Sequence, residues 1–298
     1  MKRQIIVQLV GGLGNQMFQY ATARALAIRS DAEMVLDTWS GFVRDRQYRR
    51  HYELASFPIS ARPATPLERL PFWFDRLRGR FCLPNGNVVV RRWYGDLLKE
   101  TKFEYLSEVA EYAVTHRTWM TGYWQTAAYF EDYRSTIEQE LMPSQPTEAH
   151  FIELGRNMRS ERSVALGVRL YEESNNPAVH AADGRMKSVE DVNGAAHRLS
   201  QLDTDLHFFI FCSHRSSFLE LLRLPGKVTY VTHDDGFEGT CESLWLLTQC
   251  RHHILTNSSF YWWGAWLSSA NYPSEGSEIF AADNFINKHS VLPKWHLF

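Results

Sequence analysis

The apolar residues at the start of the chain follow first a strand pattern and then a helical one. Residues 5–10 are almost wholly apolar, which predicts a buried strand. Three glycines follow at Gly11, Gly12 and Gly14, and beyond them apolar residues recur at helical spacing until the pattern ends near Ser30. The N-terminal region therefore predicts a strand, a glycine turn and a helix.

The next apolar run, residues 34–37, predicts a second strand, and a strand, a helix and a strand in succession indicate an α/β domain with a parallel sheet. Residues 41–95 alternate arginines, Arg44 among them, with aromatic residues and prolines, so we expect loops and short helices there. This basic stretch suits acceptor contacts, a membrane-surface patch or a merely solvated surface. Residues 118–125 then predict a strand that runs into a turn, and residues 129–141 a helix.

The polar segment 142–150 contains two prolines, Pro143 and Pro146, which end the preceding helical pattern. Since few contacts cross such linkers, we predict two domains, 1–150 and 151–298. The second contains further strand patterns at 163–168, 207–212 and 227–231. Parallel sheets bind ligands beyond the carboxyl ends of their strands. Ligand-facing residues are therefore expected where these strands end, at Arg169, Ser213, His214 and His233.

A second strand, turn and helix lies near the C-terminus, where a helix over 244–250 and a short strand over 253–255 precede a helix over 261–267. The turn consists of Asn257, Ser258, Ser259 and Phe260, with Ser258 or Ser259 expected near the helix N-cap. A strand that leads hydroxyl groups into a helix start is typical of a phosphate site. The pattern equally fits a capped core helix with buried tryptophans, and the two interpretations are compatible.

The first glycine turn favours an anionic or sugar ligand. Glycines let a ligand approach the backbone closely, and the first turn of a helix attracts anions. Asn15 and Gln16 follow the turn, and their amides suit sugar hydroxyls. The turn lacks the third glycine of a dinucleotide loop and the Gly-Lys-Ser/Thr of a phosphate-binding NTPase loop, which disfavours a nicotinamide enzyme. A tight turn whose glycines only relieve steric strain is the alternative.

Composition limits the class of protein further. The chain has 298 residues, a formal net charge of −2 and a pI near 6.6, which argue against a general nucleic-acid binder. The sequence shows no charged-then-apolar leader and no apolar run long enough to cross a bilayer. Its four cysteines form no CxxC pair, which fits a reducing compartment. We therefore expect a cytoplasmic protein, with peripheral contact at the inner face of the inner membrane left open.

Three stretches together carry a family resemblance. GGLGNQMFQYA at 11–21, GYWQ at 122–125 and QCRHHILTNSSFYWWGAWL at 249–267 closely resemble the bacterial α-1,2-fucosyltransferases of glycosyltransferase family 11. The resemblance spans most of the chain in the same order. It implies a GT-B fold, in which two Rossmann-like domains face each other across a cleft. It also implies metal-independent, inverting transfer of fucose from GDP-β-L-fucose to the 2-hydroxyl of a terminal galactose, in a glycan such as O-antigen.

The resemblance also implies roles for single residues. The family's His-x-Arg-Arg-Gly-Asp-Tyr motif corresponds to GVRLYEE at 167–173, so Arg169 would clamp the diphosphate and Glu172 would act as base, with Glu173 second. The family's Phe-Ser-Asp-Asp corresponds to FCSH at 211–214, which leaves an acidic nucleotide contact to another carboxylate: Asp234, Asp235 or Glu242. The second domain would mainly bind GDP-fucose and the first mainly the acceptor.

The predicted site combines both sources of inference. Arg169, Glu172 and Asn15 are the predicted catalytic residues, and the predicted donor contacts are Gly12, Gly14, Gln16, Arg169, Ser213, Asn257, Ser258, Ser259 and Phe260. We expect no metal ion, because Asp-Asp-Gly at 234–236 is a common turn and because Cys250, His252 and His253 lack a second pair with ligand spacing. A transferase with another nucleotide sugar, or a non-catalytic carbohydrate-binding protein, is the alternative.

Overall fold

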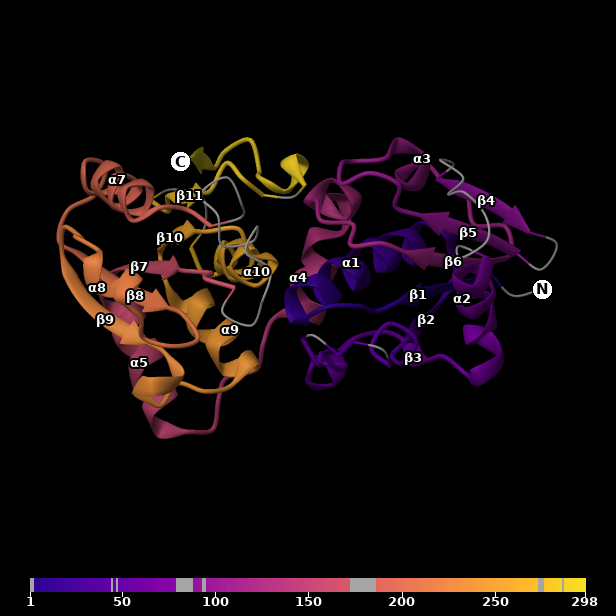
Figure 1. Cartoon of the computed structure of the whole chain (residues 1–298), viewed down its shortest axis with the longest axis horizontal. Helices are drawn as coiled ribbons and strands as arrows, with labels where there is room; N and C mark the ends of the chain where they lie inside the picture. Colours follow the sequence, from indigo (N-terminus) through magenta and orange to yellow (C-terminus); the bar gives the residue numbers. More distant parts are fainter. Residues whose placement is uncertain are drawn as a thin grey trace. The chain divides into compact units, whose positions relative to one another are not determined.

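A computed structural model of the chain describes residues 3–43, 45–46, 48–78, 88–92, 95–171, 186–272, 276–285 and 287–298 (Figure 1). The chain consists of two compact units, Met1–Leu141 and Met142–Phe298. The sequence placed the boundary later, at 150/151. The division instead falls at the first residue of the predicted linker, because helix α5 (Ala149–Ser160) packs within the second unit on α9 (Thr240–Gln249).

The first unit is built on a mixed sheet in the order β3-β2-β1-β6-β5-β4. All neighbouring strands are parallel except β4 and β5, which are antiparallel. The strands are β1 (Gln4–Gln8), β2 (Glu33–Asp37), β3 (Arg62–Pro63), β4 (Val89–Arg92), β5 (Gly95–Lys99) and β6 (Arg117–Thr121). The predicted strands at 5–10, 34–37 and 118–125 are thus confirmed as β1, β2 and β6.

Helices cover this sheet. Trp119 and Ile6 belong to a core cluster on the face that carries α2, where the Trp119 indole N–H donates to the Glu68 carbonyl over 2.8 Å. Helix α1 packs on β1 and β2 and also contacts α4. The helices are α1 (Leu13–Ser30), α2 (Pro66–Arg78), α3 (Ser107–Ala110) and α4 (Arg134–Leu141), with 3-10 turns η1 (Leu54–Ser56), η2 (Ala127–Tyr129) and η3 (Glu131–Tyr133).

Two predictions for this unit need correction. The stretch 41–95 was expected to hold only loops and short helices, but it contains the 13-residue helix α2 and the strands β3 and β4, and β5 begins at its end. Strand β5 carries only two apolar residues, Leu97 and Leu98, so its period is too short to recognise. The helix predicted over 129–141 is broken into η2, η3 and α4, because Phe130 leaves the helical conformation with φ −133° and ψ 6°.

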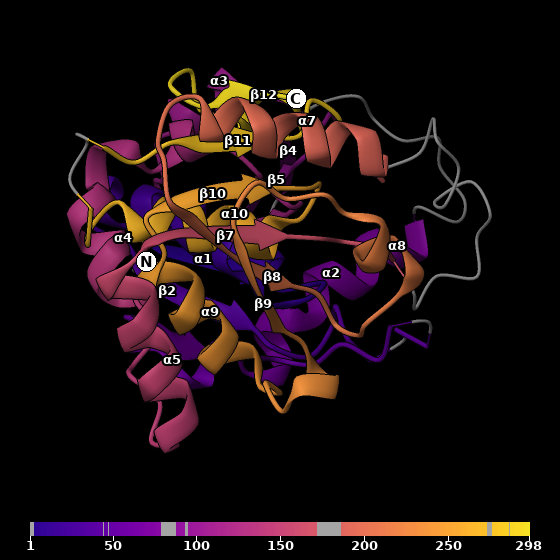
Figure 2. The ribbon, with the colours of Figure 1, turned by 90° about the vertical axis from the view of Figure 1, so that its left-hand side faces the viewer.

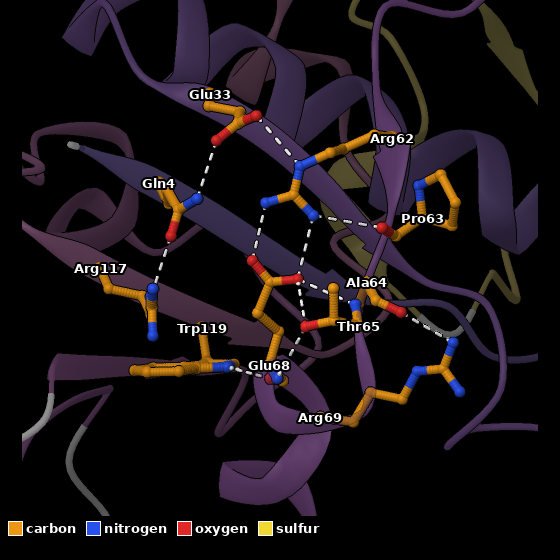
Figure 3. Close-up of polar contacts among 10 residues, drawn as sticks. All are labelled: Gln4, Glu33, Arg62, Pro63, Ala64, Thr65, Glu68, Arg69, Arg117 and Trp119. Atoms are coloured by element: carbon orange, nitrogen blue, oxygen red, sulfur yellow. Dashed lines mark hydrogen bonds and ion pairs between the residues drawn. The ribbon is translucent and has the colours of Figure 1, made fainter.

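A polar network joins the amino ends of four strands of this sheet (Figure 3). Arg62 donates to Glu33 over 3.0 Å and to both carboxylate oxygens of Glu68, over 2.7 and 2.9 Å. Gln4 donates to Glu33 and accepts from Arg117. The Arg62 hydrogen bonds lower the pKa of Glu68 to about 2, so its carboxylate stays charged and holds α2 to the sheet.

The second unit is built on a fully parallel sheet in the order β12-β11-β10-β7-β8-β9. The strands are β7 (Arg162–Gly167), β8 (Leu206–Phe211), β9 (Lys227–Val231), β10 (His252–Leu255), β11 (Ile279–Ala281) and β12 (His296–Leu297). The four predicted strands are confirmed as β7 to β10, whereas β11 and β12 were missed because they span only three and two residues. Counted outward from β7, the order is that of a Rossmann sheet, whose switch point lies between β7 and β10.

Side chains alternate between the two faces of this sheet. Leu166 and Val168 belong to the cluster that contains α7, whereas Gly167 lies directly against the Tyr261 ring of α10. Figure 2 shows α7 above the strands and α5 and α9 below them. Besides α5 and α9, the helices are α7 (Val189–Ser200), α8 (Ser217–Leu221) and α10 (Ser259–Ser268), with 3-10 turns η4 (His233–Asp235) and η5 (Lys288–Ser290).

Candidate functional site

The strongest candidate site lies at the carboxyl edge of the second sheet, at its switch point. The turns after β7 and β10 are tied together there: the Arg169 backbone N–H donates to the Thr256 hydroxyl over 2.8 Å, and that hydroxyl donates to the Gly167 carbonyl over 3.0 Å. The Tyr171 hydroxyl donates to the Asn257 carbonyl over 2.8 Å. Because side chains fix both turns, the backbone at this edge is preorganised before any ligand binds.

Arg169 stands at this edge with a partly exposed side chain. Its guanidinium lies over the Tyr171 ring, 4.8 Å from the centroid, and this contact restricts the orientation of the planar guanidinium group. Tyr171 itself adopts a left-handed backbone with φ 55°, an uncommon conformation for a bulky residue. Thus Tyr171, which the sequence did not single out, both orients Arg169 and holds the Asn257 turn.

Helix α10 begins beside Arg169. Ser258 is its N-cap and makes no side-chain capping hydrogen bond, and Ser258, Ser259 and Phe260 are all partly exposed. Asn257 is largely buried, and its amide donates to the Asn284 carbonyl over 3.1 Å. The tryptophans of the helix are buried, so α10 is also the core helix that the sequence allowed as an alternative. Exposed hydroxyls at a helix start beside a guanidinium suit a phosphate group.

The ends of β8 and β9 also lie together. The His233 N–H donates to the Ser213 carbonyl, and the rings of His214 and His233 are 5.3 Å apart. Asp234 accepts from the Arg215 N–H over 2.7 Å and contacts His214 at 3.1 Å, contacts that hold the pKa of Asp234 below its usual value.

Residues 233–236 form the predicted turn, because η4 ends at Gly236 with φ 85°. Arg215 also pairs with Asp235, whose pKa is lowered by this contact. The two aspartates that were candidates for a nucleotide contact therefore bind basic residues of the protein itself. The third candidate, Glu242, lies in the first turn of α9.

The first unit has its own switch point, between β1 and β6. The glycine turn begins at Gly11 with φ 77°, and the Asn15 side-chain oxygen accepts from the Gln125 amide over 2.8 Å. This bond links the turn after β1 to the turn after β6. A Cβ at Gly12 would lie 3.6 Å from the Arg50 guanidinium, so a cation rests against the glycine turn. The sequence did not anticipate the approach of Arg50.

Gln16 has a supporting role in this structure. Its side chain has no exposed surface, its amide donates to the carbonyls of Gly11 and His51 over 2.9 and 2.8 Å, and its oxygen accepts from the Glu53 N–H over 2.9 Å. The Gln16 side chain is therefore not exposed to a donor substrate, contrary to the predicted direct contact. It positions the glycine turn instead. Gly14 is likewise buried, whereas Gly12 and Asn15 are partly exposed.

Glu100 is a residue of this edge that the sequence missed. It follows β5, and its carboxylate accepts from the N–H groups of Tyr123 and Trp124 over 2.6 and 3.1 Å. Trp124 is buried with φ 57°, so these bonds stabilise a strained turn. Burial raises the pKa of Glu100. This turn after β6 also positions the Gln125 side chain for its hydrogen bond with Asn15.

Some predicted residues lie outside the described residues, namely Glu172, Glu173 and Arg44. Cys250 and His253 are fully buried within the second unit. In the described ranges, no three His, Cys, Asp or Glu side chains are grouped to hold a metal ion. No helix in the same ranges is long and apolar enough to cross a membrane.

Comparison with known proteins gives consistent matches. The model of "Glycosyl transferase family 11" matches residues 224–296. An Escherichia coli "Alpha-1,2-colitosyltransferase" is 24% identical over 273 residues, covering 89% of this chain and 88% of its own. The E. coli "O-antigen biosynthesis glycosyltransferase WbnK" is 26% identical over 287 residues, covering 88% and 89%.

Solved structures agree on the fold. The fucosyltransferase NodZ from Bradyrhizobium superposes with a TM-score of 0.54 at 15% identity, covering 89% of this chain and 92% of its own. Arabidopsis thaliana FUT1 in complex with GDP gives 0.51 at 10% identity, covering 94% and 70%. The two Rossmann-like units thus form a glycosyltransferase fold of the GT-B type. The family match over residues 224–296 and the two E. coli relatives support a fucosyltransferase-like glycosyltransferase related to family 11.

Proposed function

We propose that this chain is an inverting α-1,2-fucosyltransferase, which moves L-fucose from GDP-β-L-fucose to the 2-hydroxyl of a terminal galactose in a glycan such as O-antigen. The observation that carries the proposal is the switch point of the second unit, where Arg169 and the start of α10 are fixed side by side through Thr256. A guanidinium fork and a helix start are suited to a diphosphate. In support, one relative is named for an α-1,2 transfer and the other for O-antigen biosynthesis.

Inverting transfer develops charge at two places. The departing GDP gains negative charge, which Arg169 and the hydroxyls of Ser258 and Ser259 would stabilise, with Ser213 on the same edge. The sugar ring becomes cationic while the acceptor hydroxyl attacks its opposite face. Asn15 would orient a sugar from the first unit, since its amide is held by Gln125. In this division of roles, the second unit mainly holds the donor and the first unit the acceptor.

The acceptor hydroxyl must also lose its proton. Glu172 is the proposed base and Glu173 the second choice, since a carboxylate within hydrogen-bond reach can accept that proton. We propose that the reaction needs no metal ion, because a cationic fork and a helix start can carry the diphosphate charge alone.

A transferase with a different nucleotide sugar is the second candidate, and the colitosyltransferase relative specifically favours colitose as the transferred sugar. Such an enzyme would use the same diphosphate contacts, so the two candidates differ only in what touches the sugar. A non-catalytic carbohydrate-binding protein is a third candidate, and it would bind glycan without releasing GDP.

The deciding measurement is GDP release together with glycan product, from GDP-fucose with a panel of galactosyl disaccharides in buffer containing EDTA. Transfer to the 2-hydroxyl of terminal galactose, with Glu172→Gln inactive yet still binding GDP, is the expected result. Turnover with nucleotide-linked colitose but not with GDP-fucose would move the assignment to the second candidate. Activity that vanished with EDTA and returned with magnesium or manganese would refute metal independence, and full activity of Glu172→Gln would remove that residue as base.

A further inference from the structure

A group of apolar side chains on the first unit is left exposed beside the carboxyl edge. The exposed fractions are 44% for Trp39, 44% for Val43, 78% for Leu67 and 43% for Leu70. We call these four residues, together with the partly exposed Trp73, the Trp39 patch. Single exposed leucines are ordinary on a protein surface, but clustered ones indicate an interaction site.

Contacts between the two segments show that the patch is continuous. The rings of Trp39 and Trp73 have their centroids 5.6 Å apart, which joins the segment after β2 to helix α2. The Val43 N–H donates to the Trp39 carbonyl over 3.1 Å, so both belong to one turn. Leu67, Leu70 and Trp73 recur every three residues in α2 and follow one side of the helix.

The fold holds this turn in place. The buried carboxylate of Asp37 accepts from the N–H groups of Trp39 and Ser40, over 3.1 and 2.9 Å. Gly41 packs directly on the Leu9 carbonyl, so the turn rests on the end of β1, next to the glycine turn. The exposure of Trp39 is therefore a consequence of a fixed backbone.

Cations border the patch. The Arg69 guanidinium lies 5.8 Å from the Trp39 ring centroid and is paired with the buried Asp37 carboxylate at 3.7 Å. The free charge therefore comes from Arg46 and Arg49, which are exposed. Residues 39–50 contain four arginines and one acidic residue, Asp45, whose carboxylate is occupied by the N–H groups of Tyr48 and Arg50. The surface is thus locally basic although the chain has a formal net charge of −2.

This combination identifies the partner by its chemistry. A sugar platform relies on flat rings, but the most exposed member of the patch is the branched side chain of Leu67. Aliphatic residues and tryptophans bordered by exposed arginines are what a protein presents to the headgroup region of a bilayer, where anionic lipids attract the cations. We propose that the Trp39 patch docks the first unit on an anionic phospholipid surface.

Docking of the first unit on a lipid surface does not depend on the proposed function, but the proposed function would explain why the protein binds a membrane. A surface glycan under assembly that is carried on a lipid would arrive at the membrane, and the patch lies beside the edge assigned to the acceptor.

Co-sedimentation of the full chain with vesicles tests the proposal. We expect binding to phosphatidylglycerol–phosphatidylethanolamine vesicles that falls about tenfold on phosphatidylcholine and weakens at high salt, since the cations are exposed. The double variant Leu67→Ser/Leu70→Ser should bind about tenfold more weakly, because it removes apolar surface that would enter the bilayer. The matched control, Leu202→Ser/Leu221→Ser, changes leucines of the second unit that are each 57% exposed and should bind as the parent does.

Charge-reversal variants provide a second test of vesicle binding. Arg46→Glu should weaken vesicle binding, whereas Arg156→Glu, at an exposed position in α5, should not. No binding to anionic vesicles, or equal loss in both leucine variants, would overturn the proposal. Transfer to a soluble disaccharide should be unchanged in Leu67→Ser/Leu70→Ser; a loss there would assign the patch to the acceptor site instead. Vesicle binding is measured without donor, so its outcome is independent of the proposed transfer.

Discussion

The two carboxyl edges of this chain use their polar side chains differently. In the first unit, the side chains of Gln16 and Glu100 form hydrogen bonds with backbone groups of neighbouring loops, and Gln16 is fully buried. In the second unit, the hydroxyl groups of Thr256 and Tyr171 form the hydrogen bonds that fix the backbone of the turns. The side chains of Arg169 and Ser258 are partly exposed. The same succession of strand, turn and helix therefore has buried, backbone-bound polar side chains in one unit and partly exposed ones in the other.

The contrast teaches how to interpret a motif. Amides that follow a glycine turn suggest ligand contacts when only the sequence is considered, but an amide can satisfy two backbone groups at once and is then more useful for fixing loops. Arg169 and Ser258 instead keep partly exposed side chains, which a ligand could reach. Burial, rather than residue type, separates the two uses.

The largest expected effect is on stability, from Gln16→Leu. This change leaves the carbonyls of Gly11 and His51 and the N–H of Glu53 without their side-chain partner; unpaired polar groups cost about 1–3 kcal/mol each, toward the lower end for these partly buried ones. We expect a loss of roughly 4 kcal/mol in the free energy of unfolding, measured by urea denaturation.

Ser258→Ala is the matched change in the other unit. The Ser258 side chain makes no capping bond, so its removal should alter the free energy of unfolding by no more than about 0.5 kcal/mol while weakening GDP binding. If Ser258→Ala destabilised the protein as much as Gln16→Leu, the contrast between the two edges would be wrong.

The next effect is on transfer, from Arg169→Lys. The substitution keeps the charge but loses the planar fork and its packing on Tyr171, so kcat/KM should fall about 100-fold with the melting temperature unchanged. Arg156→Lys, on the surface of α5, is the control and should keep full activity. An active Arg169→Lys would mean that Arg169 supplies only charge, or that the donor binds elsewhere.

The smallest effect concerns the amino edges of the two sheets and appears on acidification. In the second unit, burial and the nearby Arg251 lower the pKa of His252 to about 4. The unfolded chain takes up this proton below its ordinary pKa of 6.5, whereas the folded chain does not until about pH 4, so stability falls as the pH drops through that interval, by roughly 2–3 kcal/mol.

In the first unit, the pKa of Glu68 is lowered from 4.5 to about 2, so the stability from its pairing with Arg62 is lost only between these values, about 2 kcal/mol after solvent screening (Figure 3). Hydrogen exchange measured by region should therefore show the second unit loosening at a higher pH than the first. If both units lost protection from exchange at the same pH, the predicted difference between them would be wrong. Glu68→Gln should abolish the loss of protection on acidification in the first unit and leave it unchanged in the second.

Elements with a strong local period were predictable, whereas roles that depend on distant partners were not. The glycine turn with α1, and β10 with α10, carry long apolar patterns and were found from the sequence. Gln16 was assigned to a ligand because its partners His51 and Glu53 lie 35 and 37 residues away, in a stretch without period. Glu100 was missed for the same reason, since its partners belong to a turn that becomes its neighbour only when β5 pairs with β6.

The division at Leu141 and Met142 has a practical consequence for spectroscopy. Among the residues that the structure describes, every strand of each sheet comes from one continuous half of the chain, and none is exchanged between the halves. Ligation of two separately produced halves within the proline-bearing segment 142–150 would place isotopes in one sheet at a time. Signals from the switch points of the two sheets would then be resolved in separate samples of one intact enzyme.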